Sequence, residues 1–189
     1  MGSFALGKSL NIETDEAEEL IYNYLNAYPK LKEWMEKSKR DAQLKGYVKS
    51  EAGRIRHLPK AKKLYEIHGE KLMDYKYRQS LSKRMTKEEI LNIYRDYKNS
   101  INNSRNFQIQ SLSASIVNRA AIKISQWFKD NNIDAWVCAQ IHDQLIFNVP
   151  KDRSEECSKM IQHIMETNTK LSLALKAPPS LATNFKDGH

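Results

Sequence analysis

The spacing of apolar residues changes character once along this chain, and that change constrains the fold more than any other feature. Over most of the length apolar residues recur every three or four positions, which is typical of amphipathic helices. Between residues 134 and 149 they alternate instead, with Val137 and Ala139 before a break and Leu145 and Phe147 after it. This pattern predicts two antiparallel strands joined by a tight turn. We therefore predict an α+β fold that is mostly helical.

The remaining segments follow from helical spacing and from the helix-breaking residues. A hydroxyl cap at Thr14 followed by acids predicts a helix start, and Pro29 ends or kinks that helix. The predicted helices cover residues 14–28, 31–42, 104–130 and 152–170. Two glycines and a proline bracket residues 46–59, which predicts a hairpin or an irregular ribbon.

Two further segments are less regular. Residues 60–100 are densely charged, so we expect a loop followed by helices that are solvated on one side. Within them Thr86 and Glu89 have the spacing of a capping box. A short edge strand is expected in the tail, residues 178–189.

Composition narrows the classes of function. With 189 residues, 40% hydrophobic and 29% charged, the chain is typical of a globular protein. The net charge of +8 favours polyanionic partners such as DNA. There is no apolar stretch of about 18 residues and no signal-peptide layout, so no membrane partner is expected. The two cysteines, Cys138 and Cys157, form no CxxC pair, which indicates a reducing cytoplasm.

The sharpest candidate for chemistry is His142-Asp143-Gln144, which interrupts the alternating pattern. A carboxylate at a tight bend is held by paired strands yet reaches solvent, which suits an oxygen-preferring cation such as Mg²⁺. Asp is also common in turns for conformational reasons alone, and by itself this plainer interpretation is favoured.

Two other segments carry groups suited to nucleic acid. Asn106 and Gln110 could read base edges in a minor groove, and Arg105 could hold a phosphate. Arg54 and Arg56, between glycine and proline, could grip a backbone. A polar helix entry and a solvated basic turn explain these segments equally well when each is taken alone.

The order of the three segments resembles family A DNA polymerases. That family carries a Gly-Tyr-Val…Gly-Arg-x-Arg-x-Leu/Val-Pro ribbon, which corresponds to residues 46–59 here. A charged helix then leads to Arg-Asn-Phe-Pro-x-Gln, which corresponds to residues 105–110. The third motif, His-Asp-Glu at a palm hairpin, corresponds to residues 142–144. The chain resembles the phage-type members, with residues 1–100 as fingers-side helices and ribbon and residues 101–189 as the palm part.

The resemblance implies roles for these residues. Asp143 would be one of two aspartates that hold two Mg²⁺ ions, and His142 would touch the primer terminus. Gln110 and Asn106 would probe the minor groove of primer-template DNA. Arg105, Arg54 and Arg56 would lie near the DNA backbone, and dNTPs would be the other substrate.

Three departures from the family pattern bear on activity. Gln144 stands where the family has Glu, and Gln108 stands where it has Pro. The motif that supplies the second metal aspartate and the helix that binds the nucleotide are not found. We therefore expect the chain to need a complementary N-terminal fragment and to be inactive alone. The alternatives are a non-catalytic DNA-binding remnant of a polymerase and an unrelated helical interaction protein.

Overall fold

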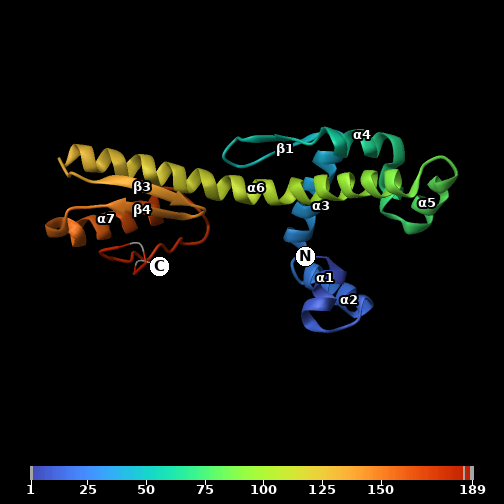
Figure 1. Ribbon diagram of the computed structural model, residues 1–189, viewed down its shortest axis with the longest axis horizontal. Coiled ribbons are helices and arrows are strands. Elements are labelled where there is room, and N and C mark those ends of the chain that lie inside the picture. The colour runs from blue at the N-terminus through green and yellow to red at the C-terminus, as the bar shows by residue number, and fades with distance from the viewer. Residues whose placement is uncertain (1, 185, 188–189) are drawn as a thin grey trace. The chain divides into compact units, whose positions relative to one another are not determined.

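The computed structural model describes residues 2–184 and 186–187 (Figure 1). It is mostly helical and contains two small antiparallel sheets, as the sequence predicts. The chain divides into two compact units. Unit 1 comprises Met1–Lys49 and Gly53–Gln108, and unit 2 comprises Ser50–Ala52 and Ile109–His189. No helix in the described part of the chain is long and apolar enough to cross a membrane.

Unit 1 begins with three helices, α1 (Ser3–Leu10), α2 (Thr14–Ala27) and α3 (Pro29–Leu44). The helices predicted over 14–28 and 31–42 are confirmed, whereas α1 was not predicted. Thr14 lies inside α2 and does not cap it, because the N-cap position belongs to Glu13, whose side chain makes no capping bond. Pro29 ends one helix and starts the next, since its fixed φ and missing N–H suit a first helical position.

The predicted ribbon is confirmed as a short hairpin in unit 1. Strands β1 (Tyr47–Lys49) and β2 (Ile55–His57) pair antiparallel, with Val48 opposite Arg56. Gly46 has a φ of +73°, a backbone conformation that a side chain would strain. At this position Leu58 donates its N–H to the Gly46 carbonyl, 2.6 Å away, which closes the base of the hairpin.

The segment after the ribbon is helical from its first residue, so the loop expected at the start of residues 60–100 is wrong. It contains α4 (Pro59–His68), the 3-10 turn η1 (Gly69–Met73), α5 (Tyr75–Ser80) and the 3-10 turn η2 (Leu81–Lys83). Pro59 stands in the first turn of α4, where proline is tolerated. Leu58, Ala61 and Leu72 are buried and anchor this segment.

The helix predicted over 104–130 begins much earlier, at Lys87, and forms the 44-residue α6 (Lys87–Asp130). The predicted capping box is confirmed: Thr86 N donates to Glu89 Oε2 at 2.8 Å, and Glu89 N donates to Thr86 Oγ1 at 3.2 Å. Helices were expected in this stretch, but weak periodicity did not indicate that the helix starting here is continuous with the one predicted over 104–130, because most side chains of residues 87–104 are polar or charged. Only Ile90, Tyr97 and Ile101 are buried hydrophobics there.

The core of unit 1 lies where α3, the ribbon, α4 and α6 meet. Its buried members are Ala42, Val48, Leu58, Ala61, Leu72, Tyr97 and Ile101. Tyr97 is fully buried, and its hydroxyl accepts a 2.7 Å hydrogen bond from Gln43 Nε2. Burial raises the pKa of the Tyr97 phenol.

Unit 2 contains the predicted hairpin and the predicted C-terminal helix. Strands β3 (Trp136–Ile141) and β4 (Gln144–Asn148) pair antiparallel, with a register irregularity between Val137 and Ala139 that interrupts the simple alternation. After the 3-10 turn η3 (Lys151–Arg153), α7 (Ser154–Thr167) contributes buried Cys157 to the second core. The other buried members of that core are Ala120, Ile124, Phe128 and Ile133.

The predicted edge strand in the tail is wrong for the residues described there, 178–184 and 186–187, which form no strand; Phe185 and residues 188–189 lie outside the described residues. The approach to the tail is held by a helix instead of a sheet. Ala177 N donates to the carboxylate of Glu166 on α7 at 3.1 Å. The backbone N–H of Ala177 is therefore bonded to a side chain and not to a neighbouring strand.

Candidate functional site

The turn between β3 and β4 consists of two residues, His142 and Asp143. Ile141 pairs with Gln144 directly across it, so the strands fix both ends of the turn. His142 has a φ of +55°, in the left-handed region that histidine enters more readily than most side chains. The two turn side chains are exposed, and so is Gln144. A short paired scaffold therefore presents the predicted imidazole and carboxylate to solvent.

The Asp143 carboxylate makes no hydrogen bond or ion pair with any side chain in the described part of the chain, so it is available to an external ligand. Within that part, no three His, Cys, Asp or Glu side chains form a group that could hold a metal ion. At the hairpin turn, Asp143 is therefore the single carboxylate that could bind a cation. A two-ion site requires more ligands than this one carboxylate.

Asn106 and Gln110 lie four positions apart on α6 and are both exposed. Residues at this spacing lie on the same side of a helix. Neither side chain is engaged in a hydrogen bond with other described residues, so both amides are free to bond to a ligand.

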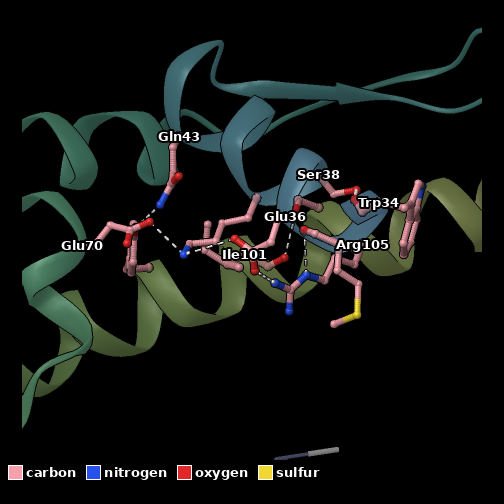
Figure 2. Close-up of polar contacts among 11 residues, drawn as sticks. Trp34, Glu36, Ser38, Gln43, Glu70, Ile101 and Arg105 are labelled. Atoms are coloured by element: carbon pink, nitrogen blue, oxygen red, sulfur yellow. Dashed lines mark hydrogen bonds and ion pairs between the residues drawn. The ribbon is translucent and has the colours of Figure 1, made fainter. Parts of the chain in front are cut away.

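Arg105, by contrast, is partly buried and already bonded within unit 1. Its Nε donates to the carbonyl of Met35 on α3 at 3.3 Å, and its Nη2 lies 3.9 Å from Glu36 Oε1 (Figure 2). Burial lowers the pKa of the guanidinium, and the charge of Glu36 opposes that shift. Arg105 therefore holds α3 against α6, a structural role that its sequence motif did not reveal.

The two ribbon arginines have different surroundings. Arg54 follows Gly53, whose φ is +84°, and its side chain is exposed. Arg56 is also exposed, and its guanidinium carbon lies 5.9 Å from the centre of the Phe107 ring of α6. This distance is within reach of a cation–π contact, which orients the Arg56 side chain along α6 while leaving its charge in solvent.

The predicted site residues are divided between the two units. Asn106, Arg105, Arg54 and Arg56 belong to unit 1, whereas Gln110 and the His142-Asp143-Gln144 turn belong to unit 2. That they act together on one substrate stays a prediction.

Sequence analysis missed one group of side chains on the charged segment. Tyr75 and Arg78 of α5, with Tyr94 and Lys98 of α6, stack in an alternating row. The spacings Tyr-x-x-Arg and Tyr-x-x-x-Lys were the available signal, because residues three or four apart on a helix are neighbours.

Comparison with known proteins identifies the lineage of this fold. The family model of DNA polymerase family A matches residues 1–187, and the chain therefore belongs to that family. It is 25% identical over 189 residues to DNA polymerase I of Pseudomonas aeruginosa and 27% identical over 188 residues to DNA polymerase I of Bacillus caldotenax. The two alignments include 100% and 99% of this chain, but only 18% of the length of each relative.

A solved structure agrees on the fold. The POL domain of Pol1 from M. smegmatis, in complex with DNA primer-template and dNTP, matches 93% of this chain with a TM-score of 0.68 and 21% identity. The match covers 26% of that chain. This chain thus corresponds to a small part of the polymerases that it resembles.

Proposed function

We propose that this chain is the C-terminal part of a DNA-directed DNA polymerase, which adds dNTPs to a primer 3′ end during DNA replication. The observation that carries the proposal is the exposed, unengaged carboxylate of Asp143 on a two-residue turn between paired strands. The motif around it lies within a family match that spans almost the whole chain. In this proposal the enzyme acts in the cytoplasm and is of phage type.

Each exposed site residue has a role in the proposal. Asp143 is one ligand for Mg²⁺, and His142 positions the primer terminus beside it. Gln110 and Asn106 bind the minor groove of the primer-template through their free amides. When bound, two Mg²⁺ ions lower the pKa of the primer hydroxyl and neutralise charge on the transferred phosphoryl group. Asp143 alone does not complete such a site, so a second carboxylate must come from outside these residues.

The missing groups are supplied, in this proposal, by an N-terminal fragment that carries the second metal aspartate and the nucleotide-binding helix. The shape of unit 2 supports this requirement. In the described residues β3 and β4 form a sheet of two strands, which packs against α6 and α7 through partly buried Leu145 and Phe147 and has no third strand. Trp136 and Ile141 of β3 are exposed, at 50% and 39%. A larger palm would cover such surface.

Primer extension tests the proposal. The purified chain, given primer-template, dNTPs and Mg²⁺, should incorporate nothing, and incorporation by the chain alone would refute the need for a second fragment. Joined to the N-terminal part, it should extend the primer. Asp143→Asn should then abolish extension, whereas Asp134→Asn, which neutralises another exposed carboxylate shortly before β3, should not.

A second candidate function is supported by two features. Gln144 lacks the carboxylate usual in this family, and the exposed arginines of the ribbon would bind DNA without any metal. A non-catalytic DNA-binding remnant would retain primer-template binding in the joined complex but would show no extension, with or without Asp143. Extension that depends on Asp143 decides between the two.

A further inference from the structure

Four side chains of unit 1 form a row in which aromatic rings and cations alternate. The Arg78 guanidinium carbon lies 5.9 Å from the ring centre of Tyr75 and 4.1 Å from that of Tyr94. The Lys98 ammonium lies 5.6 Å from the centre of the same Tyr94 ring. We call Tyr75, Arg78, Tyr94 and Lys98 the ladder. It runs from α5 onto α6.

The middle of the ladder is fixed by the backbone. Arg78 Nη1 donates to the carbonyls of Leu72 at 2.9 Å and Met73 at 2.7 Å. These two bonds hold the guanidinium in place between the tyrosines. Because the position of Arg78 does not depend on a ligand, the rings beside it are preorganised.

The ends of the ladder are open to solvent. The Tyr75 side chain is 69% exposed, and Lys98 is exposed. A tyrosine that only fastened α5 to α6 would bury most of its ring, as Tyr97 does in the core. Tyr75 therefore contributes little packing and presents an aromatic face to a ligand.

The charge around the ladder is strongly positive. Residues 69–84 hold five lysines and arginines against two acids. Both acids are engaged internally: Asp74 accepts from Lys76 N at 2.8 Å, and Glu70 lies 2.8 Å from Lys39 Nζ. Over the described ranges, no carboxylate lies within ion-pair distance of the cations of this segment. These cations are Lys71, Lys76, Arg78, Lys83 and Arg84.

We propose that the ladder and the lysines beside it bind single-stranded DNA, with one unpaired base stacked on Tyr75 and the phosphates neutralised by Lys98 and its neighbours. Stacking on exposed aromatic rings within a basic surface is how proteins hold single strands without reading sequence. The bases of a duplex are already stacked on one another, so they cannot stack on Tyr75. An acidic peptide would supply negative charge but no base to stack on the ring. The proposal rests on the proposed function, which supplies the strand: the unpaired template of a primer-template.

The test is the binding of a fluorescent thymidine oligonucleotide of about 15 nucleotides to the full chain, measured by anisotropy in EDTA. Tyr75→Ala should raise Kd about tenfold, as expected for the loss of one stacked base, while Tyr75→Phe should retain affinity. Lys98→Ala should lower the slope of log affinity against log salt by roughly 0.7, the contribution of one phosphate on a single strand. Thermal unfolding of each variant should match the wild type.

Tyr22→Ala is the matched control. Tyr22 is 61% exposed and also carries a lysine over its ring, with Lys32 Nζ at 5.4 Å, but it lies on α2 among acidic residues. Its loss should leave Kd unchanged. An unchanged Kd in Tyr75→Ala overturns the proposal. So does equal Tyr75 dependence with duplex DNA, or displacement of the oligonucleotide by polyglutamate as effectively as by single-stranded DNA.

The failure of this proposal and that of the polymerase assignment are distinguishable. Binding in EDTA needs no metal and no catalysis, so the Kd of the oligonucleotide is measured independently of primer extension. If Tyr75→Ala leaves Kd unchanged while the joined complex extends the primer in an Asp143-dependent way, only the ladder proposal is refuted. If Tyr75→Ala weakens binding but the joined complex extends no primer, only the polymerase function is refuted.

Discussion

Gln108 on α6 donates a hydrogen bond from Nε2 to the hydroxyl of Ser38 on α3, 2.8 Å away although 70 positions separate the two residues. The same nitrogen donates to the carbonyl of Ser104 at 2.9 Å, and Ser38 donates in turn to the carbonyl of Trp34 at 2.9 Å. Ser38 is 2% exposed, so this polar link lies inside unit 1. The family pattern has proline at position 108, which could not make the link.

Replacing Gln108 by the family's proline should therefore destabilise this chain. Proline inside a continuous helix removes a backbone donor and clashes with the carbonyl four residues earlier, at a cost of about 3 kcal/mol or more. Gln108→Ala removes only the side-chain bonds and should cost about 1 kcal/mol. Urea denaturation measures both, with exposed Asn102→Ala on the same helix as control. Wild-type stability in Gln108→Pro would show that α6 does not need helical geometry there.

The sequence predicted the site hairpin better than it predicted the helices around it. Alternation from Val137 to Phe147 is a strong signal because one face of the hairpin is partly buried against α6 and α7. Polar and charged residues concealed the continuity of α6 from its capping box to the helix over 104–130, because only a few apolar positions of the first turns touch the core. Arg105 could not be assigned from its motif, because its partner Met35 lies far away in sequence and contributes a backbone carbonyl. Any residue type can supply a backbone carbonyl, so such a partner cannot be recognised from the amino-acid sequence.

The left-handed backbone of His142 predicts which substitutions the turn tolerates. A β-branched residue is disfavoured at a φ of +55°, so His142→Val should cost about 1–2 kcal/mol. His142→Asn should be close to neutral, since asparagine enters this region readily. Chemical denaturation followed by tryptophan fluorescence reports on the hairpin through Trp136 of β3. His57→Val is the control, because β2 has extended backbone; an equal loss there would remove the conformational explanation.

The ion pair between Lys39 and Glu70 predicts a pH-dependent contribution to stability. The hydrogen bond from Lys39 lowers the pKa of Glu70 below the ordinary 4.5. A lowered carboxyl pKa stabilises the fold above the unfolded value, and that contribution is lost as the pH falls through the folded pKa. Glu70 is 62% exposed, so screening limits the contribution to a few tenths of a kcal/mol.

Thermal unfolding of wild type and Glu70→Gln between neutral and acidic pH checks this prediction. The wild type should be slightly more stable at pH 7, and the difference should vanish below the folded pKa of Glu70. Glu88→Gln serves as control, because Glu88 is exposed and has no ion-pair partner among the residues described. A difference that persisted at acidic pH would mean that Glu70 acts through packing and not through its charge.

The isolated chain should self-associate, because both units expose large apolar side chains. Phe4 is 75% exposed in unit 1, and Ile122 is 70% exposed in unit 2. In addition, β3 and β4 each leave an outer edge without a strand partner in the described residues, and such edges pair readily with other chains. Sedimentation velocity should show dimers or larger species. Phe4→Gln and Ile122→Gln should reduce their amount, and addition of an N-terminal polymerase fragment should replace them with a defined complex. A monodisperse, sharply melting monomer would contradict this prediction and, with it, the need for a covering partner.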